Sequence, residues 1–269
     1  MNPVTISKGQ GPIILGLPHG GTYLPDDIRA SLNDNGRRLA DTDWHIGELY
    51  TGLRDDVTVV VANFHRYVID ANRDPTGASL YPGQNTTGLC PVTDFDGREI
   101  YENNTAPDDG EIAQRLAAFH APYHAALAAE IVRVKARHGM AIIYDCHSIR
   151  SQIPFLFDGI LPDLNIGTDS GRTCAAHLQA LMHDIAASSS FSLVLNGRFR
   201  GGWTTRHYGQ PQTGVHAIQM EIAQAAYLEA EQAPWTYSQV KAQTLRPVLK
   251  NILDALAAAA QAMKKDHTL

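Results

Sequence analysis

The chain carries an apolar segment, residues 13–17, that stops abruptly at Pro18 and is followed by His19 and two glycines. A run of this length predicts a buried strand, and the proline and glycines predict that the chain leaves it as a loop. A second segment repeats this design, because the largely apolar residues 141–146 are followed by His147. Since sites in open α/β sheets form at the carboxyl ends of strands, we expect His19 and His147 to meet over one sheet edge.

Composition limits what the chain can be. Its 269 residues and 44% hydrophobic content suit a large α/β domain, and its net charge of -6 argues against nucleic acid as a main partner. Cys90, Cys146 and Cys174 form no Cys-x-x-Cys pair, which argues against a disulfide scaffold or a thiolate zinc site. With no signal-peptide pattern and no run near the roughly 20 apolar residues that span a bilayer, we expect a cytoplasmic protein that does not bind membranes.

Strand-like and helical segments alternate along the chain. The expected strands are 4–8, 12–17, 57–62, 66–70, 140–146, 192–195 and 215–222, and the expected helices are 26–32, 42–53, 111–138, 171–187 and 237–264. The long irregular region 74–108 predicts a loop that covers a site. These patterns predict a single α/β domain over residues 1–269, with a mixed central sheet and helices on both faces.

The candidate metal ligands lie at these strand ends. Two histidines and one carboxylate form a common hydrolytic zinc shell that leaves a coordination position open. His19 and His147 would supply the imidazoles, and Asp41, Asp43 and His45 are three candidates for the third ligand. Aspartate is frequent at helix N-caps, so either aspartate could instead cap the helix expected there.

Glu221 and a set of arginines are the other candidate functional residues. A lone glutamate in the apolar segment 215–222 is costly to bury, so Glu221 would be either an ion-pair partner of an arginine or a general base. Arginine binds carboxylates through two hydrogen bonds, so arginines in the irregular segments indicate an anionic substrate. These arginines are Arg66, Arg73, Arg150, Arg198, Arg200 and Arg206, of which we expect two or three to bind substrate and the rest to brace loops.

Two further histidines, His120 and His124, are four residues apart in the longest expected helix. That spacing could bind a metal, but no glutamate follows His120 as in a His-Glu-x-x-His motif. We therefore expect surface or packing roles for both.

Short motifs scattered over about residues 12–230 together resemble the N-formylglutamate amidohydrolase family. The motifs are Pro18-His19-Gly20-Gly21, Asp41 to His45, Arg66-Tyr67-Val68-Ile69-Asp70, Asn72-Arg73, Leu80-Tyr81-Pro82-Gly83, Asp145 to Ser151, Leu195-Asn196-Gly197-Arg198-Phe199 and Gln219-Met220-Glu221. The family is similar in plan to zinc carboxypeptidases and aspartoacylase-like deacylases. The resemblance therefore implies a zinc-exopeptidase-like, or phosphorylase/hydrolase-like, fold.

The resemblance also implies an activity, the metal-dependent hydrolysis of N-formyl-L-glutamate to L-glutamate and formate in histidine degradation. An alternative is a deacylase or carboxypeptidase-like hydrolase that acts on another N-acyl acidic amino acid. The partner would be a small-molecule substrate. The expected cofactor is one Zn²⁺ or another divalent ion, bound by His19, Asp43 and His147. The similar enzymes place the acidic ligand three residues after the first histidine, where this chain has Thr22. Asp43 is assigned by its position at a helix start, and Asp41 and His45 remain alternatives.

The remaining roles follow the same resemblance. Glu221 would be the general base and acid, and Arg150 would stabilise the oxyanion. Asn72 and Arg73 would hold one substrate carboxylate. The other carboxylate would be bound by an arginine from the set Arg66, Arg150, Arg198 and Arg206.

Overall fold

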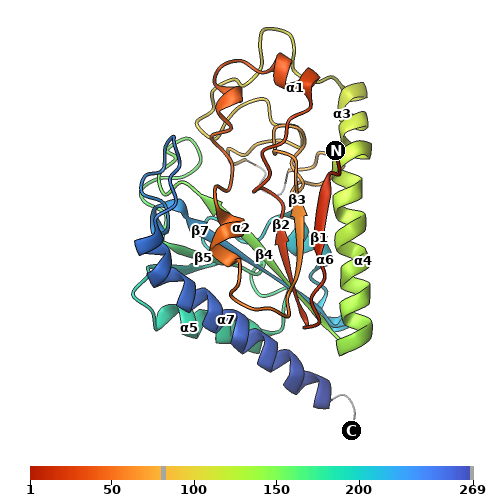
Figure 1. Cartoon of the computed structure of the whole chain (residues 1–269), viewed down its shortest axis with the longest axis vertical. Helices are drawn as coiled ribbons and strands as arrows, with labels where there is room; N and C mark the ends of the chain where they lie inside the picture. Colours follow the sequence, from red (N-terminus) through yellow and green to blue (C-terminus); the bar gives the residue numbers. More distant parts are fainter. Residues whose placement is uncertain (80–82, 267–269) are drawn as a thin grey trace.

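A seven-stranded sheet forms the centre of the molecule (Figure 1), in a computed structural model that describes residues 1–79 and 83–266. The strands are β1 (Val4–Ser7), β2 (Ile13–Leu17), β3 (Thr58–Ala62), β4 (Ala141–Ile149), β5 (Leu164–Gly167), β6 (Leu193–Leu195) and β7 (Val215–Ala223). Their order across the sheet is β1-β3-β2-β4-β7-β5-β6. The central strands β3, β2, β4 and β7 run parallel, whereas β1 is antiparallel to β3 and β5 is antiparallel to β7. The sheet is mixed, as predicted.

Helices cover both faces of this sheet, which confirms the predicted architecture. They are α1 (Asp26–Ser31), α2 (Ile46–Tyr50), α3 (Asp109–Arg115), α4 (Ala121–His138), α5 (Ala176–Ala187), α6 (Trp203–Tyr208) and α7 (Gln239–Asp266). The short turns are η1 (Gly36–Arg38), η3 (Pro211–Thr213), η4 (Gln224–Ala226) and a π-helical turn, η2 (Leu116–His120), that joins α3 to α4. In the part of the chain that the structure describes, no helix combines the length and apolarity needed to cross a bilayer.

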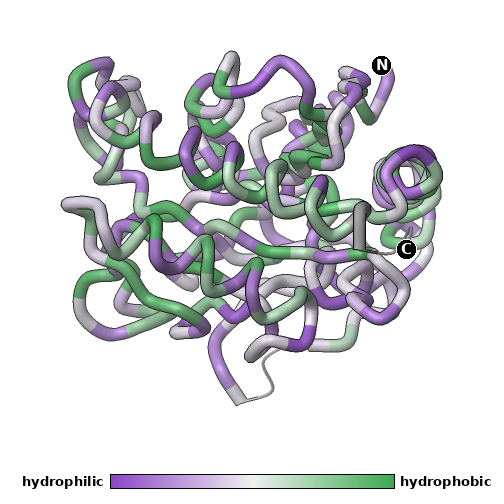
Figure 2. Tube along the Cα trace, turned by 90° about the horizontal axis from the view of Figure 1, so that it is seen from below, coloured by the Kyte–Doolittle hydropathy of each residue, from purple (hydrophilic) through white to green (hydrophobic). Residues whose placement is uncertain are grey.

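Side chains alternate between the two faces along each central strand. Ile13 and Leu15 of β2 belong to the core packed by α2, α5 and α7, whereas Ile14 belongs to the core packed by α1 and α4. Figure 2 shows hydrophobic and hydrophilic residues alternating along the chain, with several hydrophobic stretches among the segments that cross the middle of the view. Because both faces are covered, β2 is buried along its whole length, which explains its continuous apolar sequence.

One predicted strand is wrong. Residues 66–70 lie outside the sheet and form a turn, which is closed by a 2.9 Å hydrogen bond from the Val68 amide to the His65 carbonyl. Tyr67, Val68 and Ile69 are nevertheless fully buried in the core on the α1 and α4 side. The apolar sequence therefore reflected burial of this segment in the core, and not pairing with a neighbouring strand.

Two predicted helices are shorter than expected. The helix expected over 42–53 is reduced to α2, which follows His45 in a left-handed conformation at φ 58° and has no side-chain cap from an aspartate or threonine. The chain before α2 bends inward instead and buries Asp41 and Asp43. The helix expected over 171–187 begins at Ala176, since the preceding residues form a turn. The long helix ends as predicted at Gly139, which has φ 78°.

Acid should destabilise the fold through His216, a buried histidine of β7. Its Nδ1 accepts a 3.2 Å hydrogen bond from the Ala175 amide, and burial lowers its pKa to about 4. The unfolded chain takes up this proton as the pH falls through the ordinary histidine pKa near 6.5, and the folded chain resists it until about pH 4. Stability present at pH 7 is therefore lost on acidification. We expect His216→Asn to reduce the loss of unfolding free energy between pH 7 and pH 5 by about 2 kcal/mol.

Urea denaturation at the two pH values measures this difference, and any constant cost of the substitution cancels. His183 of α5, which is partly exposed, provides the control variant His183→Asn. Equal losses in the parent and in His216→Asn would contradict the assignment.

Candidate active site

A cavity of about 220 Å³ opens where β2, β4 and β7 end. Its lining includes most of the predicted site residues, namely His19, Arg66, Asn72, Arg73, His147, Arg198 and Glu221. Residues 74, 77–79 and 85–89 also line it, so part of the long irregular region borders this cavity. Leu80, Tyr81 and Pro82, part of one family-like motif, lie outside the described residues.

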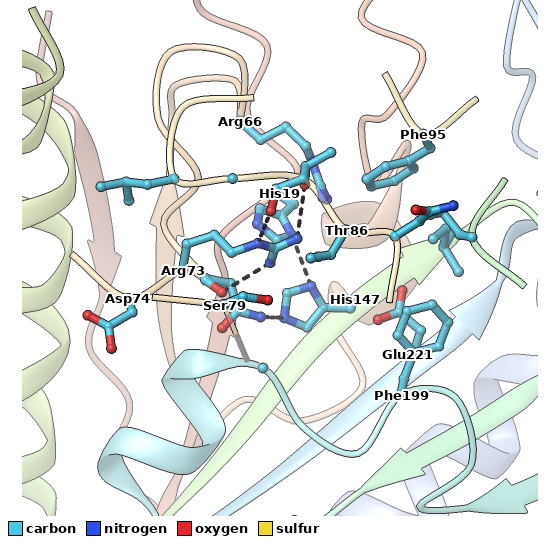
Figure 3. A pocket seen from close by; sticks show the side chains of 18 of the residues that line it. His19, Arg66, Arg73, Asp74, Ser79, Thr86, Phe95, His147, Phe199 and Glu221 are labelled. Carbon is cyan, nitrogen blue, oxygen red and sulfur yellow. Dashed lines mark hydrogen bonds between the residues drawn. The ribbon is translucent and has the colours of Figure 1, made fainter. Parts of the chain in front are cut away.

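The two strand-end histidines meet as predicted, although they are 128 positions apart in the chain. His19 follows β2, and His147 lies on the adjacent strand β4, directly opposite Glu221 of β7. The Nδ1 atoms of the two imidazoles are 3.1 Å apart, and Figure 3 shows the rings turned toward one another. Asp43 Oδ2 lies 3.9 Å from His19 Nδ1 and 3.3 Å from His147 Nδ1. Potential ligand atoms of these three buried residues thus lie within 4.8 Å of one another.

Asp43 is fixed in this position by its own contacts. Its Oδ1 accepts a 2.7 Å hydrogen bond from Arg66 Nη2, and its Oδ2 accepts one of 3.0 Å from the Ser148 amide. Burial acts to raise the pKa of Asp43, but the Arg66 guanidinium and the two histidines hold it below the usual value. The carboxylate is therefore ionised and available as a ligand.

The two alternatives for the third ligand lie elsewhere. Asp41 Oδ2 accepts hydrogen bonds from the Tyr67 hydroxyl at 2.8 Å and the Phe95 amide at 2.9 Å. His45 Nδ1 lies 2.9 Å from Glu48 at the start of α2, where both side chains are partly exposed. The structure thus brings Asp43, and neither Asp41 nor His45, to the pair of histidines.

Sequence reasoning gave no role to the two carboxylates behind the histidines, and it assigned Asn72 to the substrate, whereas the Asn72 amide lies against His147. Asp70 Oδ1 lies 2.6 Å from His19 Nε2, while Asn72 Nδ2 and Asp145 Oδ1 lie 3.0 and 3.3 Å from His147 Nε2. Such contacts orient an imidazole so that its other nitrogen faces a metal. The signal was present, because Asp70 and Asp145 both occur within the family-like motifs, but spacing alone did not distinguish a backing carboxylate from a ligand.

The two imidazoles differ in their electrostatic surroundings. Burial and the nearby Arg66 guanidinium lower the pKa of His19 to about 4. At His147 burial also acts to lower the pKa, but Asp145 and Asp43 outweigh it and raise the pKa well above the usual value. Both imidazoles thus have carboxylates nearby, but at His19 burial and the Arg66 charge outweigh the effects of Asp70 and Asp43 on the pKa.

Glu221 faces the cavity beside His147 (Figure 3). Its Oε2 accepts a 3.0 Å hydrogen bond from Gln219 Nε2, so its hydrogen-bond partner is an amide and not the arginine considered from the sequence. Burial raises the pKa of Glu221 to about 8. A buried carboxyl group with a pKa near neutrality is suited to transfer protons.

The predicted arginines divide into two groups. Arg66, Arg73 and Arg198 line the cavity. Arg150 instead donates a 3.0 Å hydrogen bond to Asp96, and Arg206 donates one of 2.8 Å to the Gly201 carbonyl; neither lines the cavity. The oxyanion role expected of Arg150 is thus not matched by its position, because an acidic residue of the covering loop holds its guanidinium elsewhere.

A close backbone approach holds Asn72 in place. Its Oδ1 accepts a 2.8 Å hydrogen bond from the Thr204 amide at the start of α6. A Cβ atom at Gly202 would lie 2.3 Å from Asn72 Nδ2, so only glycine leaves room for the amide. Gly202 therefore shapes the site although it brings no functional group.

Comparison with known proteins adds independent observations. The family model for N-formylglutamate amidohydrolase matches residues 11–228. N-formylglutamate deformylase of Pseudomonas aeruginosa is 44% identical over 257 residues, which cover 95% of this chain and 96% of that protein. The enzyme of the same name from Pseudomonas putida is 43% identical with the same coverage. The crystal structure of N-formylglutamate amidohydrolase from Ralstonia eutropha JMP134 superposes with a TM-score of 0.80 at 23% identity, over 99% of this chain and all of that one.

Proposed function

The chain belongs to the N-formylglutamate amidohydrolase family, and we propose that it hydrolyses N-formyl-L-glutamate to L-glutamate and formate. The observation that carries this proposal is that His19, His147 and Glu221 line one cavity that also holds arginines, with the Asp43 carboxylate beside the two histidines. A cavity of about 220 Å³ suits a substrate smaller than a drug-sized ligand. The reaction would serve histidine degradation in the cytoplasm, as the family resemblance implies.

We further propose that His19, Asp43 and His147 hold one divalent metal ion, with Zn²⁺ as the simplest choice. Two imidazole nitrogens and one carboxylate are a donor set that zinc hydrolases use, and each imidazole is backed by a polar group at its other nitrogen. When bound, such an ion supplies Lewis acidity toward a carbonyl oxygen and toward water.

The chain's own residues would carry out the proton transfers. Glu221 takes a proton from the water whose oxygen attacks the formyl carbon, and it delivers that proton to the amine nitrogen as the carbon–nitrogen bond breaks. Arg66, which lines the cavity and contacts Asp43, replaces Arg150 as the arginine assigned to the charge that develops on the formyl oxygen.

Arg73 is the proposed anchor for one substrate carboxylate, and Arg198 is the candidate for the other. The Arg73 guanidinium is pre-oriented, because its Nε and Nη2 donate to the carbonyl and hydroxyl of Thr87 at 2.9 and 3.0 Å. A charge-assisted contact contributes on the order of 1.5–3 kcal/mol. Arg73→Ala should therefore raise KM for N-formylglutamate by at least about tenfold.

Steady-state kinetics of Arg73→Ala measures this effect. Arg172→Ala is the matched control, since Arg172 is exposed and pairs with Asp169 away from the cavity lining. An unchanged KM in Arg73→Ala would show that Arg73 does not bind a substrate carboxylate.

A substrate panel tests the proposed function itself. We expect the highest kcat/KM with N-formyl-L-glutamate among the N-formyl, N-acetyl and N-succinyl derivatives of glutamate and aspartate. Stoichiometric release of formate and glutamate should accompany turnover. Preference for an acetyl or succinyl derivative would instead favour the alternative of a deacylase for acidic amino acids.

A further inference from the structure

Two buried histidines, His120 at the end of η2 and His124 in the first turn of α4, contact the backbone of the segment that carries Asn72 and Arg73. His124 Nε2 lies 2.7 Å from the Ala71 carbonyl oxygen, and His120 Nε2 lies 3.1 Å from the Arg73 carbonyl oxygen. A carbonyl oxygen can only accept, so each Nε2 carries the proton and donates it. The sequence predicted packing roles for this pair, but both histidines bind specific backbone groups.

The two carbonyls that receive these hydrogen bonds lie on either side of the Asn72–Arg73 pair, one just before Asn72 and one just after the Cα of Arg73. Asn72 directs its amide at His147 Nε2 at 3.0 Å, and Arg73 lines the cavity. Rotation of the peptide that carries either carbonyl would turn Asn72 or Arg73 away from its present direction. The histidines therefore hold the two peptide groups that determine the directions of the Asn72 and Arg73 side chains.

Neighbouring aromatic residues hold the two imidazoles of His120 and His124 in this orientation. The Tyr208 hydroxyl lies 3.1 Å from His124 Nδ1, and the Trp203 ring packs against both imidazoles at centroid distances of 5.7 and 4.7 Å. The π-helical turn η2 ends at His120, and such turns are frequent at functional sites. Burial lowers the pKa of both imidazoles, that of His124 to about 3, so each remains neutral with its single proton on Nε2.

We infer that His120 and His124 are positioning residues that clamp the carbonyls of Arg73 and Ala71 and thereby aim Arg73 into the cavity and Asn72 at His147. This inference rests on the proposed function, because it assigns these residues to the same site. Neither histidine is among the residues that line the cavity, so both act through the segment that they hold.

Paired substitutions at His120 separate positioning from mere packing. His120→Leu removes the donor, whereas His120→Gln can place an amide Nε2 at nearly the same position. We expect His120→Leu to raise KM for N-formylglutamate about fivefold with kcat within about twofold of the parent, and His120→Gln to restore KM. In an Arg73→Ala background, His120→Leu should raise KM no further, because the effect passes through Arg73.

His124 is tested in the same way, with kcat as the sensitive parameter. His124→Leu should lower kcat about fivefold through Asn72 and His147, and His124→Gln should recover it. His138→Leu is the matched control, since His138 also lies on α4 with its Nε2 2.9 Å from a backbone carbonyl, that of Gln10, at a more exposed position. We expect the control variant to keep the parent kcat and KM.

Hydrogen exchange tests the clamp without reference to activity. The amides of Asn72 and Arg73 donate to Asp70 at 2.8 and 3.2 Å, so both leucine variants should exchange these amides at least about tenfold faster, and His138→Leu should not. Unchanged exchange, or equal effects of leucine and glutamine on KM and kcat, would overturn the inference. Failure of the proposed function would give a different result. The parent protein would not hydrolyse N-formylglutamate, but the leucine variants would still exchange the amides of Asn72 and Arg73 faster.

Discussion

Replacing Glu221 by glutamine is expected to lower kcat by roughly 10²–10⁴-fold, the usual contribution of a positioned acid–base group. Glutamine keeps the size of the side chain and can still form a hydrogen bond with Gln219, but it cannot take a proton from water. KM and metal content should therefore stay close to those of the parent. Steady-state kinetics together with elemental analysis of the purified variant measures both quantities.

Glu231→Gln is the matched control for this substitution. The Glu231 carboxylate accepts hydrogen bonds from the Ser151 and Ala225 amides and is not among the cavity-lining residues, so its loss should affect stability and leave kcat unchanged. A kcat within about threefold of the parent in Glu221→Gln, with metal retained, would show that another residue moves the proton.

Replacing a proposed metal ligand is expected to weaken metal binding strongly and to abolish activity. In His147→Ala or Asp43→Asn we expect the affinity for Zn²⁺ to fall by at least about 100-fold, since loss of a backing contact alone costs about 10–100-fold. Equilibrium dialysis against Zn²⁺, followed by elemental analysis, measures the loss. Circular dichroism should show a folded protein in each case.

Asp41→Asn and His45→Ala provide controls from the same segment. Asp41 is engaged by Tyr67 and Phe95, and His45 by Glu48, so both variants should keep the metal. If Asp43→Asn retained the metal and Asp41→Asn lost it, the third ligand would be assigned to the wrong aspartate.

The meeting of His19 and His147 could be predicted because it depends on topology. His19 follows β2 and His147 lies near the end of β4, and parallel neighbouring strands deliver their carboxyl ends to one edge whatever the length of chain between them. Glu221 could be identified for a similar reason, since a carboxylate in an apolar strand is costly to bury without a role. Two-sided burial of the central strands likewise followed from their continuous apolar sequences.

Asp43 was preferred over Asp41 only through the family resemblance, because local sequence does not distinguish the two aspartates. Their positions depend on the bend before α2, where His45 adopts a left-handed conformation and the Asp43 amide donates to the His19 carbonyl. Arg150 was misplaced for a related reason, because a long side chain can reach many partners. Asp96, more than 50 residues away in sequence, captures its guanidinium. Such choices depend on tertiary contacts that periodicity does not encode.

The close approach at Gly202 has a consequence for how the sequence can vary. Position 202 touches no proposed ligand or proton donor, yet the smallest possible side chain would collide with the Asn72 amide. Among random variants selected for activity, position 202 should accept no other residue, not even alanine, while neighbouring loop positions should vary. A glycine that never varies at this position would reflect the space that the Asn72 side chain requires. Transfer of this site to another scaffold would therefore require a glycine opposite the asparagine as well as the functional groups themselves.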